Sequence, residues 1–249
     1  MKKKRKPIFN LLKKTVKCFQ GKYTIEGLDN IPSEPSILVG NHAHAFGPFF
    51  AELHFPLQRQ TWCASEIMNM KTAPSYIHFD FWGHKPKCSQ WFYKIMSYIC
   101  APLCVYVFKS ADTIPVYRDT RGINTFKQTL SALKEGKHIF IFPEGRSSFN
   151  HIVNEFQNKF VDVAKMFFNK TKKLLNFVPF YISPKLKKVC FGKPITFNPD
   201  EPMETQRQAI CEYLKLEITK MAEALPLHKV VPYDNIKHKL YPQNKSTTT

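Results

Sequence analysis

Residues 36–42 read SILVGNH, and residues 137–145 read KHIFIFPEG. Each stretch contains a short apolar run bounded by proline or glycine, which is the pattern of a strand buried on both faces. Each run delivers polar side chains at its carboxyl end, Asn41 and His42 in the first and Glu144 in the second. Two polar sites at strand ends indicate an α/β sheet whose ligands bind at one edge.

The spacing of apolar residues outside these stretches alternates between strand and helix patterns. The best defined helix carries Ile123, Phe126, Leu130 and Leu133, and Gly136 is suited to end it. Other strands are expected at 113–118, 177–182 and 188–191, and other helices at 49–55, 160–168 and 210–225. This order predicts an α/β fold with a mixed, mostly parallel sheet flanked by helices.

The N-terminal segment combines positive charge with an apolar stripe. Its apolar residues recur three or four positions apart: Ile8, Leu12, Val16 and Phe19. Its basic residues have no acidic neighbour between positions 2 and 17: Lys2, Lys3, Lys4, Arg5, Lys6, Lys13, Lys14 and Lys17. The pattern predicts a basic amphipathic helix on an anionic membrane surface, with a solubilising tail or a nucleic-acid arm as alternatives.

The amino-acid composition limits the expected binding partners and the expected cellular compartment. The 249 residues carry a net charge of +18, which attracts both anionic membranes and nucleic acids. No nucleic-acid recognition motif accompanies the charge, so no nucleic-acid partner is expected. The seven cysteines lack paired spacing and no secretory signal precedes them. We expect a peripheral or monotopic protein on the cytoplasmic face of a membrane, with segments 1–22 at the membrane, 23–232 as the folded domain and 233–249 as a polar tail.

Residues 91–108 form an apolar and aromatic stretch at the short limit for a membrane span. Lys94 and Pro102 argue against a span and favour a core or interfacial segment. The many tyrosines and the tryptophan of this stretch would suit a surface that dips into the lipid headgroup layer. The sequence leaves a packed core segment and a dipping segment both open.

Four short blocks occur in a fixed order along the chain: Asn41-His42, Arg118, Phe142-Pro143-Glu144-Gly145 and Val178-Pro179. This set resembles the blocks of the glycerolipid acyltransferases that make phosphatidic acid from lysophosphatidic acid, over residues 35–195. The resemblance implies the glycerol-phosphate acyltransferase type of fold. It also implies transfer of an acyl group from acyl-CoA or acyl-carrier protein to a hydroxyl of a lysophospholipid or a related acceptor, with no further cofactor.

The resemblance also implies roles for individual residues. His42 would be the general base that deprotonates the acceptor hydroxyl. The residues expected to bind substrate are Asn41, His44, Arg118, Glu144, Gly145 and Arg146, and no metal site is expected. A guanidinium such as that of Arg118 suits bidentate binding of a phosphate.

Two positions depart from the family pattern. Gly47 stands where the family has the aspartate that orients the histidine, and Arg146 lies one position earlier than the family's arginine. Glu52, Glu66 and Asp80 are candidate replacements for the missing carboxylate. A second hypothesis is therefore a degenerate relative that binds lipid or acyl carrier without turnover, and a third is a metal site at the His42-Ala43-His44 pair.

Overall fold

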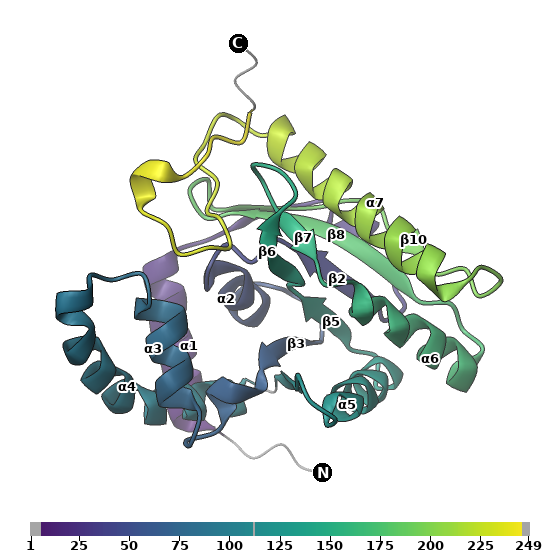
Figure 1. Ribbon diagram of the computed structural model, residues 1–249. Helices are drawn as coiled ribbons and strands as arrows, with labels where there is room; N and C mark the ends of the chain where they lie inside the picture. Colours follow the sequence, from purple (N-terminus) through teal and green to yellow (C-terminus); the bar gives the residue numbers. More distant parts are fainter. Residues whose placement is uncertain (1–5, 112, 246–249) are drawn as a thin grey trace.

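The computed structural model describes residues 6–111 and 113–245. The strands of the main sheet are β1 (Thr24–Glu26), β2 (Ile37–Gly40), β3 (Arg59–Ala64), β4 (Ile114–Val116), β5 (His138–Ile141), β8 (Asn176–Ser183), β9 (Lys188–Phe191) and β10 (Ile195–Thr196). Their order is β1-β9-β8-β2-β5-β3-β4, with β10 paired to β8 (Figure 1). The neighbours from β8 to β4 are parallel, whereas β9 and β10 run antiparallel to β8. The predicted mixed, mostly parallel sheet is confirmed.

Helices cover both faces of this sheet. They are α2 (Phe46–Leu53), α5 (Gly122–Lys134), α6 (Asp162–Thr171) and α7 (Met203–Ala224). Successive side chains of a strand point to opposite faces, so Ile37 and Val39 pack in the core formed with α5, α6 and α7, whereas Leu38 packs in the core that includes Phe50 of α2. Figure 1 shows α6 and α7 along one side of the sheet, with α2 on the other.

Two helices are inserted between β3 and β4. They are α3 (Ala73–Trp82) and α4 (Gln90–Ser110), which form a hairpin with a small core of its own around Ile77, Ala101 and Val105. The hairpin stands at one end of the molecule in Figure 1, away from α7.

The expected N-terminal helix is present as α1 (Pro7–Gln20). The four residues of the predicted apolar stripe differ in burial. Leu12 and Val16 are half-buried, whereas Ile8 and Phe19 are exposed. The buried residue of α1 is Phe9, which is not part of the predicted stripe. Lys2, Lys3, Lys4 and Arg5 of the expected basic segment lie outside the described residues.

The described part of the expected polar tail, residues 233–245, packs on the body of the protein. Asn244 is fully buried, and its side-chain amide donates to the carbonyls of Ala222 at 2.8 Å and Leu225 at 3.1 Å. Its side-chain oxygen accepts the backbone N–H of His228 at 2.8 Å. These bonds tie the segment to the end of α7, so its described residues form a strap rather than a free end. Residues 246–249 lie outside the described part.

Candidate active site

The site forms where the carboxyl ends of β2 and β5 meet. The two strands are parallel neighbours, with Val39 opposite Ile141, so the residues that follow them emerge side by side. Asn41 is 1% exposed, and both ends of its side-chain amide bond to the backbone of Ile182 in β8, at 2.8 Å and 3.1 Å. Asn41 therefore fixes the end of β2 against β8, with its amide fully engaged in the fold.

Glu144 holds the two strand ends together. One carboxylate oxygen accepts the backbone N–H of His42 at 2.6 Å, and the other accepts the backbone N–H of Asn154 at 2.9 Å. Glu144 begins β6 (Glu144–Ser148), which pairs with β7 (Asn154–Phe156) in a ribbon that the sequence analysis did not predict. Burial raises the pKa of Glu144 to about 7, against the opposing effect of its two backbone hydrogen bonds. The carboxyl group is thus a positioning group at the base of the site.

The His42 ring lies between two aromatic side chains. The Phe142 ring stands edge-on at 5.3 Å between centroids, and the Tyr233 ring stands edge-on at 5.7 Å. Burial lowers the pKa of His42 to about 4. The imidazole is therefore neutral at physiological pH, which is the form that accepts a proton.

Phe142 also occupies the space of the missing aspartate. Gly47 lies in the first turn of α2, and a Cβ built on it would come within 2.5 Å of the Phe142 ring and 2.9 Å of the His42 carbonyl. Real Cβ atoms do not approach other atoms so closely, so no side chain fits at position 47 while the ring stays where it is. The glycine is therefore part of a rearranged aromatic wall beside His42.

The backbone takes over part of the contact with the His42 ring. Hydrogen bonding to backbone groups of His44 and of His42 itself raises the pKa of the ring, opposing the effect of burial, which identifies these groups as acceptors. Ala43 and His44 have left-handed backbone conformations, with φ of 45° and 53°, which turn the chain sharply after His42. A carbonyl can fix the tautomer of an imidazole, but it carries no full charge to stabilise the imidazolium.

The three candidate carboxylates lie in different surroundings. Glu52 forms ion pairs with Lys13 at 2.6 Å and Arg59 at 2.9 Å, so it serves the packing of α1 and α2. Glu66 lies near Cys63 and Arg121, whose pKa values it raises. Asp80 lies nearer the site, because its charge raises the pKa of Tyr233. Asp80 thus acts on the neighbour of His42, and burial raises its own pKa.

The two predicted arginines both lie near residues of α3. Arg118 follows β4, is exposed, and lies close enough to Asp80, Tyr76 and Tyr233 to lower their pKa values. Arg146 is also exposed, and its guanidinium lies over the ring of Phe79 at 5.3 Å. Arg118 is therefore the cation linked through Tyr233 to His42, whereas Arg146 contacts Phe79 of α3.

His44 and Gly145 complete the predicted set. The His44 ring nitrogen Nε2 lies 3.1 Å from the Tyr241 hydroxyl, and burial lowers the pKa of His44. The carbonyl of Gly145 accepts a hydrogen bond from the Asn154 amide at 2.8 Å. No group of three or more His, Cys, Asp or Glu side chains within residues 6–111 and 113–245 is placed to hold a metal ion.

The strap supplies the residues that sequence reasoning missed. Tyr233 contacts the His42 ring, Asp234 accepts a hydrogen bond from the Asn154 amide at 3.3 Å, and the Asn235 amide donates to the backbone carbonyl of Asp80. Residues 233–235 thus join His42, β7 and α3 across the top of the site. No motif or periodicity marks these positions, because their role comes from a loop that returns from the far end of α7.

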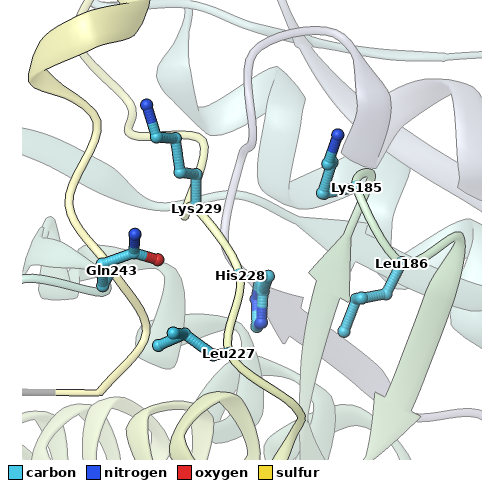
Figure 2. Close-up of a pocket in the computed structure, with 6 residues that line it drawn as sticks. All are labelled: Lys185, Leu186, Leu227, His228, Lys229 and Gln243. Atoms are coloured by element: carbon cyan, nitrogen blue, oxygen red, sulfur yellow. The ribbon is translucent and has the colours of Figure 1, made fainter.

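Two open hollows lie beside the strap. The first, of about 490 Å³, is lined by Lys185, Leu186, Leu227, His228, Lys229 and Gln243 (Figure 2). The second, of about 450 Å³, includes Phe46 and also Tyr241, the partner of His44. His228 is held in place by Tyr181 at 2.9 Å and by the Pro226 carbonyl at 2.8 Å. Neither hollow is lined by His42 or Glu144, so both lie outside the strand-end site.

Comparison with known proteins finds a family model and solved structures that this chain resembles. The family model described as Acyltransferase matches residues 74–184, a range that includes Arg118 and Glu144 but not His42. The crystal structure of the 1-acyl-sn-glycerophosphate (LPA) acyltransferase PlsC from Thermotoga maritima is similar in fold, with a TM-score of 0.51 at 16% identity, covering 91% of this chain and 86% of that chain. A comparison with curated protein sequences gives no match. The chain is therefore similar to the Acyltransferase family over residues 74–184, and it shares its overall fold with a solved 1-acyl-sn-glycerophosphate acyltransferase.

Proposed function

We propose that the protein transfers an acyl group from acyl-CoA or acyl-carrier protein to a hydroxyl of a lysophospholipid or related glycerol-phosphate acceptor, with His42 as the general base. One observation carries this proposal. The backbone of His42 is fastened to Glu144 at the junction of β2 and β5, while its ring is held neutral between Phe142 and Tyr233. A neutral imidazole with a fixed backbone at a strand-end site suits general base catalysis.

The proposed reaction needs one proton shuttle. His42 accepts the proton of the acceptor hydroxyl while the alkoxide oxygen attacks the thioester carbonyl carbon. The tetrahedral intermediate then collapses, the carbon–sulfur bond breaks, and the proton on His42 passes to the thiolate that leaves. The products are the acylated acceptor and a free thiol. No further cofactor enters this balance.

The same surroundings limit the expected rate. A pKa of about 4 makes His42 a weak proton acceptor, and no carboxylate is in hydrogen-bonding contact with its ring among the described side chains. Loss of the orienting aspartate in a comparable triad lowers turnover by about 10⁴ while geometry survives. We therefore expect slow turnover.

Arg118 is the proposed binding group for the acceptor phosphate. Its guanidinium is exposed and lies near Tyr233, so a phosphate bound there would approach the same aromatic wall as His42. The proposed acceptor is a membrane lipid, reached by a protein that sits on an anionic, cytoplasm-facing membrane surface. The basic helix α1 supports this placement.

The test is thiol release from acyl-CoA and from acyl-carrier protein with a panel of lysophospholipid acceptors. His42→Ala should abolish acceptor-dependent thiol release, whereas His84→Ala, at an exposed histidine outside the site, should leave most of it. Arg118→Gln should raise KM for phosphate-bearing acceptors more than it lowers kcat. Turnover that survives in His42→Ala would remove His42 from the mechanism.

A second candidate function is binding of lipid or acyl carrier without turnover. The observation that favours it is the Phe142 ring in the space of the catalytic aspartate. This alternative predicts tight, saturable binding of a lysophospholipid with no thiol release from any donor. Equilibrium binding to the same acceptor panel separates it from the primary proposal.

A further inference from the structure

The outer surface of α4 has the reverse of the usual pattern for a helix on a globular protein. The residues that face the body are small, with Ser97, Ala101 and Val105 buried against α3 and its surroundings. The residues that face away are large and apolar, with between 48% and 67% of each side chain exposed: Trp91, Phe92, Ile95, Tyr98, Ile99 and Leu103. A helix on a water-facing surface normally buries its apolar stripe.

The charges of α4 and of the turn before it have one sign. The stretch from residue 81 to residue 111 contains Lys85, Lys87, Lys94 and Lys109 and no acidic residue. Lys87, Lys94 and Lys109 are exposed. An apolar face edged by cations matches an anionic lipid surface, where the apolar side chains enter the acyl boundary and the lysines meet the headgroups.

The same surface continues onto the neighbouring helices. Phe79 and Phe81 of α3 are 63% and 40% exposed, and Ile8 and Leu11 of α1 are 63% and 66% exposed. The start of α1 is docked on the end of α4, because the Lys6 ammonium group donates to the carbonyl of Ser110 at 2.8 Å. In Figure 1 α1, α3 and α4 lie together at one end of the molecule.

From these observations we infer that the α3–α4 hairpin is a membrane wedge, which inserts the Trp91, Ile95, Ile99 and Leu103 face of α4 into the boundary of an anionic bilayer. By length and composition Lys87–Ser110 could cross a membrane, but α4 stays in contact with the body through Ser97, Ala101, Val105 and Ser110. The helix therefore lies along the surface of the bilayer. This inference adds a second, deeper membrane element to the peripheral placement in the proposed function.

The wedge also stands next to the site. The Asp80 carbonyl of α3 accepts a hydrogen bond from Asn235 of the strap, and Asp80 and Arg118 act on each other electrostatically. A lipid leaving the bilayer beside α3 would therefore meet Arg118 and the strap before His42. The hairpin thus places the membrane surface beside the proposed acceptor phosphate site.

The experiment measures vesicle binding by the full chain without any acyl donor, so its result does not depend on turnover. Phosphatidylcholine vesicles with and without phosphatidylglycerol are the probes, and co-sedimentation is the readout. Ile95→Glu and Ile99→Glu should each weaken binding to the anionic vesicles by about tenfold, since a charge replaces an inserted apolar group. Leu216→Glu, on α7 and 44% exposed, is the matched control and should bind as the wild type does.

A depth measurement completes the test. The chain has three tryptophans, and brominated lipids should quench wild-type fluorescence while quenching Trp91→Phe much less, because Trp62 and Trp82 are packed in the protein. Wild-type affinity in both glutamate variants, or equal quenching in Trp91→Phe, would overturn the wedge. A wild-type dimer in solution that these variants dissociate, with vesicle binding unchanged, would overturn it in favour of a second copy of the chain.

Discussion

The carboxyl ends of β2 and β5 are neighbours in the sheet, yet they differ in how closely they follow the family pattern. At the end of β5 the Phe-Pro-Glu-Gly block is intact, and Glu144 binds two backbone N–H groups. At the end of β2 the histidine remains, but glycine replaces the aspartate. The structure links the two ends, because Phe142 from the intact block fills the space left by the altered one. The two blocks thus pack as one unit, in which a change in one block alters the surroundings of residues in the other.

Loss of the Glu144 carboxyl group should have the largest effect on this pair of strand ends. Glu144→Ala leaves the backbone N–H groups of His42 and Asn154 without their acceptors, at a cost of about 3 kcal/mol in the free energy of unfolding. Thiol release should fall below detection with it. Urea denaturation measures the first effect, and unchanged stability would mean that water replaces the carboxylate at both groups.

The second largest predicted effect is on the pH dependence of the free energy of unfolding. The pKa of Glu144 is raised to about 7 in the folded protein, so the carboxyl group stabilises the fold fully below its unfolded pKa of 4.5 and loses that contribution as pH rises through 7. Glu144→Gln should therefore gain about 3 kcal/mol in stability relative to the wild type between pH 4.5 and 8. His42 has the opposite sign, since its lowered pKa removes stability as pH falls from 6.5 through 4.

Comparison of the two proteins at each pH cancels the His42 contribution, which both share. Chemical denaturation at half-unit pH intervals gives the difference curve. Parallel stability curves for the wild type and Glu144→Gln would show that Glu144 titrates normally in the fold.

Restoring the family's aspartate tests whether Phe142 and Gly47 act as a pair. Gly47→Asp alone forces the Phe142 ring aside and should destabilise the fold by about 1 to 2 kcal/mol without raising turnover. Phe142→Ala alone should leave a void beside His42. The double variant should be more stable than the sum of the two single effects allows, by about 1 kcal/mol, and turnover should rise about tenfold.

A double-mutant cycle of unfolding free energies, measured beside thiol release, decides this point. Additive single effects would show that the two positions are independent. Higher turnover in Gly47→Asp alone would show that the ring moves without cost.

The smallest predicted effect concerns Tyr233. Tyr233→Ala removes the ring that packs on His42 and should lower kcat/KM about fivefold, or about 1 kcal/mol, whereas Tyr233→Phe keeps the ring contact and should stay near the wild type. Steady-state kinetics of the two variants separate the ring from the hydroxyl. A Phe variant as impaired as the Ala variant would assign the effect to the hydroxyl beside Arg118.

The parts of the fold that have a periodic pattern of apolar residues could be predicted from the sequence. The buried strands at 36–40 and 177–182 and the amphipathic helix at 123–133 are present, because periodicity reports burial directly. The hairpin was harder to assign, since the outward apolar face of α4 has the same composition as a core helix. Only the exposed fractions of the α4 side chains show that this apolar face points away from the body of the protein.

The position of the candidate site at the strand ends could be predicted from the sequence, whereas the contacts of residues 233–235 above it could not. Motif spacing located His42, Arg118 and Glu144, because parallel strands bring their carboxyl ends together. Spacing says nothing about the atoms that a side chain touches, so the Phe142 ring in the aspartate's space could not be foreseen. The strap contacts of Tyr233 and Asn235 depend on long-range folding of an irregular segment, which no local signal encodes.

The strap affects the order in which the contacts of the site can form. Asn235 and Asp80 are 155 positions apart, so the hydrogen bond that closes the roof joins parts of the chain made at very different times. The hydrogen bond between them can therefore form only after nearly the whole chain has been made, later than any contact between the strand ends that it covers.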